Sequence, residues 1–128
     1  MTENEISRIV FDRGLKIHRK LGIGLYENIY EECLFYELQK ADVKVERQKL
    51  LNIQYEELVL ENAFRMDLVI DNKVVLEIKS VDNLNNFHAA QLKNYLRLGN
   101  YKLGLLFNFN SQLFKNGVMR IANGLDQY

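Results

Sequence analysis

The chain has 128 residues, which is the size of one domain with a single core, and we interpret residues 1–128 as such a domain. Its 17 basic and 17 acidic side chains give a formal net charge of zero, which excludes a generally basic surface as the means of binding nucleic acid. The single cysteine excludes an internal disulfide, and no signal segment or membrane span is evident, so we expect a cytoplasmic protein.

Helical spacing of apolar residues characterises the first part of the chain. It predicts one helix from about Glu3 to Lys20 and a second from about Tyr26 to Lys40. Gly22 and Gly24 separate the two helices. Cys33 falls on the apolar side of the second helix and has no Cys or His at ligand spacing, so we predict packing rather than a zinc site.

The second part of the chain alternates between strand and helix patterns. Strands are predicted within Val43–Tyr55 and a helix over Leu84–Leu98. The almost wholly apolar run Lys102–Phe107 is typical of a strand buried on both faces in a parallel pairing, and Val118–Ala122 fits an edge strand. This order predicts an α/β fold with a mixed sheet flanked by helices.

Between Phe64 and Lys79, two alternating apolar runs flank Asp71-Asn72-Lys73 and predict a β-hairpin. The loop suits such a turn because Asn tolerates left-handed backbone geometry. The register that makes apolar side chains face one another pairs Met66 with Ile78, Leu68 with Leu76, and Ile70 with Val74. The same register places Asp67 opposite Glu77, with Lys79 two residues away on the same face.

Two facing carboxylates repel each other, and each raises the pKa of the other unless a cation lies between them. Magnesium and manganese ions prefer such oxygen ligands. A metal held by Asp67 and Glu77 would polarise a phosphodiester, and Lys79 would orient or deprotonate the attacking water or stabilise charge on the phosphate. The alternative is a solvated strand face with a salt bridge between Glu77 and Lys79, which the hairpin pattern alone favours.

The helix after the hairpin offers further polar candidates. His88, Gln91 and Tyr95 lie within about 60° of one another on a helix, on the side that also carries Leu84, Leu92 and Leu98. Polar groups within an apolar stripe need partners, which a polar site at the sheet surface would supply. The alternative is that Tyr95 belongs to the core and Gln91 bonds a backbone group.

The two N-terminal helices offer Glu27, Glu31 and His18. Either glutamate would supply a further metal ligand or position water if it turned inward, but for Glu31 a solvated helix face is the stronger expectation. Glu27 also suits a helix start for purely electrostatic reasons. His18 is a weaker candidate ligand, since a histidine near a helix end also complements the helix dipole.

Three motifs together carry a resemblance to a known family. Asp67 followed by Glu77-Ile78-Lys79 resembles the PD-(D/E)XK nuclease core motif, and Gln91 with Tyr95 is similar to the QxxxY motif of RecB-type members. Gly24–Tyr30 matches the signature of the GxxExxY family in that superfamily. The resemblance extends from about residue 17 to residue 123, and one departure is Met66 where the motif has proline.

The resemblance implies a restriction-endonuclease-like αβββαβ core and roles for individual residues. Asp67 and Glu77 would bind a metal together with the main-chain carbonyl of Ile78, and Lys79 would be catalytic. Glu27 would be an accessory acid. Gln91 and Tyr95 would position the site or the nucleic-acid strand.

The expected function is Mg²⁺- or Mn²⁺-dependent hydrolysis of phosphodiester bonds by a metal-activated water, in DNA rather than RNA. The alternative is a catalytically silent nuclease-fold module that binds nucleic acid or a protein partner, a reading that the neutral charge favours. A homodimer is a further expectation, because Val43–Glu61 and Val118–Ala122 are predicted to expose sheet edges.

Overall fold

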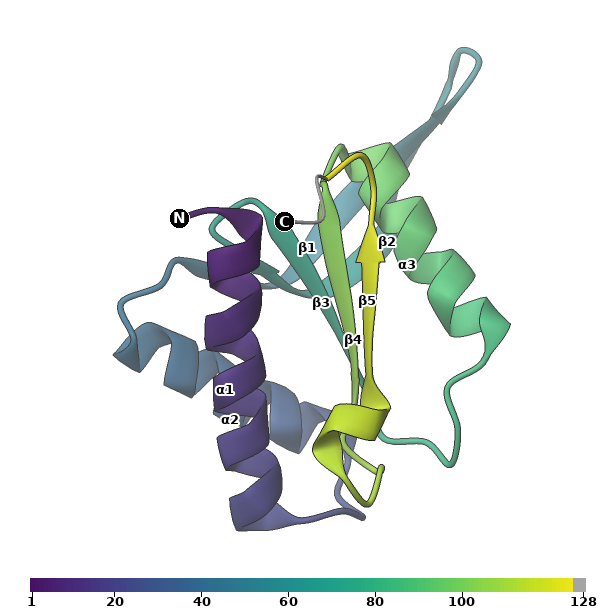
Figure 1. Ribbon diagram of the computed structural model, residues 1–128. Coiled ribbons are helices and arrows are strands. Elements are labelled where there is room, and N and C mark those ends of the chain that lie inside the picture. The colour runs from purple at the N-terminus through teal and green to yellow at the C-terminus, as the bar shows by residue number, and fades with distance from the viewer. Residues whose placement is uncertain (126–128) are drawn as a thin grey trace.

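The computed structural model describes residues 1–125, in which a mixed five-stranded sheet lies between helices on both faces (Figure 1). The helices are α1 (Glu3–Leu21), α2 (Glu27–Lys40) and α3 (Asn86–Gly99), with a short 3₁₀ helix η1 (Phe114–Gly117). The strands are β1 (Val45–Tyr55), β2 (Leu58–Ile70), β3 (Val74–Lys79), β4 (Leu103–Asn108) and β5 (Val118–Ala122). They lie in chain order across the sheet, and only β3 and β4 are parallel. The predicted mixed sheet and helical layers are confirmed.

Two hydrophobic clusters explain why both faces of the sheet are covered. On one face, α1 and α2 pack against alternate residues of β3 and β4, including Leu76 and Phe107. On the other, α3 packs against the intervening residues, including Val75 and Leu106. Strand β4 is therefore buried along its whole length, as the apolar run predicted. Among residues 1–125, no helix is long and apolar enough to cross a membrane.

The link between α1 and α2 is held by a buried tyrosine. Gly22 and Gly24 have φ angles of 73° and 90°, a region that side chains disfavour, which is why glycine suits this reversal. The hydroxyl of Tyr30 donates a hydrogen bond to the carbonyl of Gly22 (2.7 Å) and accepts one from the N–H of Leu25 (3.3 Å). Its ring stacks on Phe109 at 4.3 Å between centroids. These contacts fix the start of α2 against the core.

The hairpin of β2 and β3 has the predicted turn but only part of the predicted register. Leu68 pairs with Leu76 and Ile70 with Val74, and Asp71 and Asn72 take left-handed φ angles of 52° and 55°. Backbone pairing stops at Leu68, so the predicted pairing of Met66 with Ile78 is wrong. Met66 packs on the α3 side, whereas Ile78 packs on the α1–α2 side. Before Leu68, β2 is paired with β1 but not with β3.

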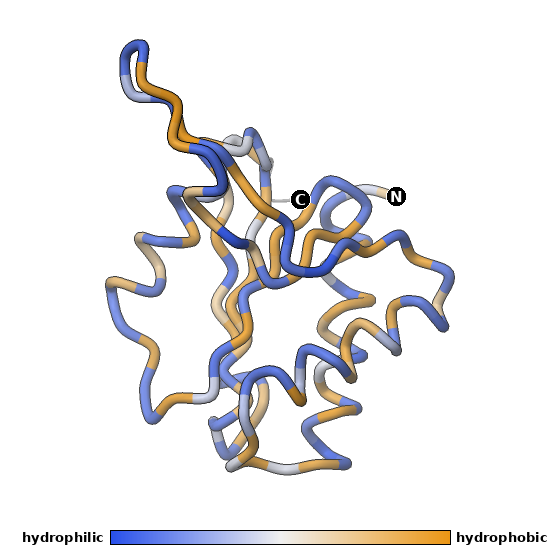
Figure 2. Tube along the Cα trace, turned by 180° about the vertical axis from the view of Figure 1, so that it is seen from behind, coloured by the Kyte–Doolittle hydropathy of each residue, from blue (hydrophilic) through white to orange (hydrophobic). Residues whose placement is uncertain are grey.

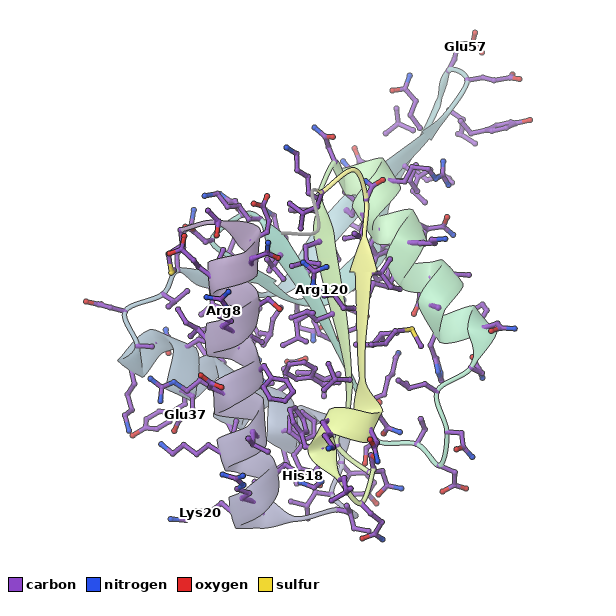
Figure 3. The ribbon with its side chains drawn as sticks, in the orientation of Figure 1. Arg8, His18, Lys20, Glu37, Glu57 and Arg120 are labelled. Carbon is purple, nitrogen blue, oxygen red and sulfur yellow. The ribbon has the colours of Figure 1, made fainter. Side chains whose placement is uncertain are left out.

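Strands β1 and β2 extend together into a hairpin arm, residues 52–63, which reaches beyond the body of the domain (Figure 1). Figure 2 shows a hydrophobic stretch along this arm outside the core, and the exposed apolar residues of the arm include Leu58, Val59 and Leu60. Glu57 lies at the tip (Figure 3). The sequence pattern predicted the end of β1 at Tyr55 but not the start of β2 at Leu58. The first side chains of β2 are exposed, so no alternation of apolar and polar residues marks where the strand begins. A homodimer stays a prediction.

Candidate active site

Where β2 separates from β3, hydrogen bonds from the backbone to two carboxylates take the place of backbone pairing. Glu77 Oε2 accepts a hydrogen bond of 2.8 Å from the backbone N–H of Asp67. Asp67 Oδ2 accepts a bond of the same length from the N–H of Ile78. Each side chain thus holds the opposite strand, and the two carboxylates lie next to each other. Their predicted meeting is confirmed, although the contact is made by side chains rather than by the strand ladder.

Burial makes this acidic pair electrostatically unfavourable. Glu77 is only 3% exposed, and burial followed by the charge of Asp67 raises its pKa to about 8. Burial also raises the pKa of Asp67, while the N–H of Ile78 and the charge of Lys79 oppose that rise. The alternative of a solvated strand face is therefore wrong for Glu77. The neighbouring protein groups therefore do not fully offset the charge that the pair would carry when both carboxyls are ionised.

The carbonyl of Ile78 lies on the same side of β3 as the acidic pair. Within a strand, the N–H and C=O of one residue point to the same side. The N–H of Ile78 bonds to the Asp67 side chain, so its C=O also points toward β2, past the last residue pair of that ladder. This carbonyl oxygen adds a further group of the kind that coordinates metal ions next to the two carboxylates. Among residues 1–125, no three His, Cys, Asp or Glu side chains converge as ligands for one metal ion.

An open cavity of about 430 Å³ gives access to the pair from the N-terminal end of α2. Half of its lining comes from α2 and the residue before it, and half from the strands. The lining residues are Tyr26, Glu27, Asn28, Glu31, Gln48, Asp67, Ile78 and Lys79. Four of the residues proposed from sequence are thus brought together at this cavity: Glu27, Asp67, Ile78 and Lys79. Glu77 lies buried beside Asp67.

Glu31, for which a solvated helix face was the stronger expectation, and Gln48, for which no role was predicted, both belong to the site. The expected solvated position of Glu31 is wrong, since Glu31 is buried and accepts hydrogen bonds from Arg47 Nε (2.7 Å) and Gln48 Nε2 (2.6 Å). Gln48 Nε2 also lies 3.3 Å from Asp67 Oδ1. Glu31 lies one turn after Glu27, which was the available sequence signal; for Gln48 there was none.

The backbone of Gln48 is strained at this point. Its φ angle of 53° is left-handed, which costs a residue with a side chain about 1–2 kcal/mol. Gln48 lies between Arg47 and Lys49, which pair with Leu68 and Met66 on β2, so Asp67 is the residue across from it. The distortion turns the Gln48 amide toward Glu31 and Asp67. A strained residue of this kind persists where the surrounding contacts hold it in place, which is common at functional sites.

Glu27 reaches the cavity from the start of α2 and is tied to the end of β3. Its Oε2 accepts a hydrogen bond from the N–H of Ser80 (3.2 Å), and the Ser80 hydroxyl donates to the carbonyl of Leu25 (2.7 Å). The charge of Glu27 contributes to the raised pKa of Asp67. Glu27 thus lies at the cavity wall, and its accessory role stays a prediction.

Tyr95, on α3, lies near enough to the acidic pair to be affected by the charges of Glu77 and Asp67. Tyr95 is buried and packs against Phe64 (4.8 Å between centroids), and burial together with the charges of Glu77 and Asp67 raises its pKa to about 12. Gln91 is half-buried and is not among the residues that line the cavity. His88 instead forms the helix cap with Asn85. Leu98 is exposed, so the predicted apolar stripe ends earlier.

His18 is held elsewhere. Its Nε2 lies 2.7 Å from the carbonyl oxygen of Ser111, and its ring packs against Phe114 in η1 at 5.6 Å (Figure 3). The residues that line the cavity do not include it. Cys33 packs against the cluster formed with α1 and α2, in keeping with the prediction made for it.

Comparison with known proteins identifies both a family and a fold. The model of a family described as the PD-(D/E)XK nuclease superfamily matches residues 4–121. Among solved structures, the crystal structure of SSO0001 aligns with a TM-score of 0.57 and 20% sequence identity, covering 94% of this chain and 79% of that chain. At that identity the likeness concerns the fold alone. The search of curated proteins gave no match.

Proposed function

The chain belongs to the PD-(D/E)XK nuclease superfamily, and from this premise we propose that it is a divalent-metal-dependent nuclease that hydrolyses phosphodiester bonds in DNA. One observation carries the proposal. Asp67 and Glu77 are clasped side by side, largely out of solvent, next to an open cavity that also receives Lys79. A merely structural pair of this kind would be destabilising, because both carboxylates resist ionisation where they lie.

The donor set suits a hard divalent cation such as Mg²⁺ or Mn²⁺. Such ions take carboxylate, carbonyl and water oxygens, and their charge favours ionised carboxylates. Asp67, Glu77 and the carbonyl of Ile78 would hold the ion, with Glu27 as a further candidate at the cavity wall. When bound, it would polarise the phosphodiester and lower the pKa of a water.

Lys79 and Tyr95 would position the reacting groups, and Lys79 would also supply positive charge. Lys79 presents an ammonium group at the cavity, where it would orient the attacking water and stabilise charge that develops on the phosphate. Tyr95, whose pKa of about 12 keeps its hydroxyl protonated at neutral pH, would position Glu77 from the α3 side. Gln91 and His18 are given no role here: neither they nor Tyr95 line the cavity, but Tyr95 is affected by the charges of the acidic pair.

The test is cleavage of labelled DNA by the purified protein with Mg²⁺ or Mn²⁺, and with EDTA as the metal-free control. Asp67→Asn and Glu77→Gln should each abolish cleavage, and Lys79→Met should lower its rate about 10²- to 10³-fold, while all three retain the fold by circular dichroism. Glu57→Gln, at the tip of the arm, is the matched charge-to-amide control and should cleave like the unmodified chain.

Cleavage that survives all three substitutions would exclude this site as the catalytic centre. If cleavage is absent throughout, and metal-independent binding of DNA is unchanged in Glu77→Gln, the catalytically silent binding module is the better description. RNA offered in the same assay decides between the two nucleic acids.

A further inference from the structure

An exposed aromatic ring stands at the edge of the cavity. Tyr26 is 81% exposed, and it lines the same cavity as Asp67 and Lys79. Single exposed aromatic residues are common and need no explanation by themselves. Tyr36 and Tyr55 are also exposed, but neither lines this cavity. The position of Tyr26, rather than its exposure, distinguishes it.

The backbone that carries this ring is fixed on both sides. Before it, the N–H of Leu25 bonds to the Tyr30 hydroxyl and the carbonyl of Leu25 accepts from the Ser80 hydroxyl. After it, the Glu27 side chain accepts from the N–H of Ser80. The carbonyl of Tyr26 itself accepts a bond of 3.1 Å from the N–H of Ile29. A ring presented on a fixed backbone loses little conformational entropy when a ligand stacks on it.

We propose that Tyr26 is a stacking platform for an unpaired nucleobase next to the scissile phosphate, so that the site takes single-stranded nucleic acid. This inference rests on the proposed function, because it places the phosphate at the acidic pair. The ring supplies a flat apolar surface, and stacking on aromatic side chains is the common means of holding single strands without sequence preference. The zero net charge agrees with a site that does not rely on a broad basic surface.

A paired duplex fits this arrangement less well. In a duplex the base faces are stacked on one another, so a ring can reach one only after the base is extruded, at a cost of a few kcal/mol. At the mouth of the cavity, Tyr26 is accompanied by one lysine and several acidic groups, which gives few phosphate contacts to offset that cost.

The chain contains no tryptophan, so Tyr26→Trp introduces a fluorophore whose emission reports on this position alone. The ring is exposed, so the substitution leaves packing unchanged. The emission is followed during titration with a short oligothymidylate strand in EDTA, where cleavage does not interfere. We expect saturable quenching by the single strand and much weaker quenching by a duplex of equal length. Tyr55→Trp, on the arm, should respond to neither.

Affinity is measured separately with a labelled oligothymidylate by anisotropy. Tyr26→Ala should bind about 5- to 150-fold more weakly, while Tyr26→Phe retains affinity because it keeps the ring. Equal affinity of Tyr26→Ala and the unmodified chain, or quenching by duplex as strong as by single strand, would overturn the proposal. Binding is measured in EDTA, without cleavage. The stacking proposal and the proposed function can therefore fail independently: binding can be found without cleavage, and cleavage without quenching.

Discussion

Replacing Glu77 with glutamine should stabilise the metal-free protein, and more so at higher pH. Its folded-state pKa is raised from 4.5 to about 8, so the folded protein holds a proton that the unfolded chain releases between those values. The stability that this proton supplies is complete below pH 4.5 and is lost as the pH rises through 8. The full difference corresponds to about 5 kcal/mol. Glutamine is neutral throughout, and its amide oxygen still accepts the bond from Asp67.

The gain in the free energy of unfolding from Glu77→Gln should therefore grow from about 1 kcal/mol at pH 5 to about 4 kcal/mol at pH 8. Urea unfolding followed by circular dichroism, in EDTA at both pH values, measures it. Glu57→Gln at the arm tip serves as the control and should change stability little at either pH. A gain that is equal at both pH values, or a loss at pH 8, would refute the argument from burial and charge.

Adding Mn²⁺ at pH 8 extends the same experiment. A cation that binds the acidic pair only in the folded state raises the free energy of unfolding by RT ln(1 + c/Kd), where c is the free cation concentration, so the unmodified chain should unfold at higher urea. Glu77→Gln should gain distinctly less, because one charged ligand is missing. An equal gain in both proteins would place the metal at another site.

Three further substitutions distinguish a residue needed for cleavage from residues needed for stability. Lys79→Met should lower the cleavage rate about 10²- to 10³-fold with an unchanged urea midpoint, and a shifted midpoint would indicate a structural role instead. Glu31→Ala leaves the partly exposed Arg47 without its buried partner and should cost about 2 kcal/mol in urea unfolding; an unchanged midpoint would contradict the described ion pair. Tyr30→Phe removes the hydroxyl bonds to Gly22 and Leu25 and should cost about 1–2 kcal/mol, with faster amide exchange in residues 22–27 if the link loosens as expected.

Local pattern was sufficient for most of the elements, though not for the start of β2, and for the part of the hairpin register that leads to the acidic pair. Alternation has a period of two residues and the turn a fixed length, so Leu68 could only pair with Leu76 if both apolar sets were to be buried. This ladder ends one pair short of Asp67 and Glu77, which therefore lie close enough for each carboxylate to bond to the opposite strand. Strand β4 was recognisable for the same kind of reason, because a run without alternation needs cover on both faces.

Only the tertiary structure decided what lies against the acidic pair. Periodicity assigns a side chain to a face of its own element, but it does not say which element packs there, and for Glu31 that neighbour is Arg47 of β1. The left-handed turn of Gln48 depends on contacts with a helix and a strand that are distant in sequence. In the sequence, Tyr26 is an ordinary residue before a helix. It lies beside the cavity because that helix begins near the point where β2 separates from β3.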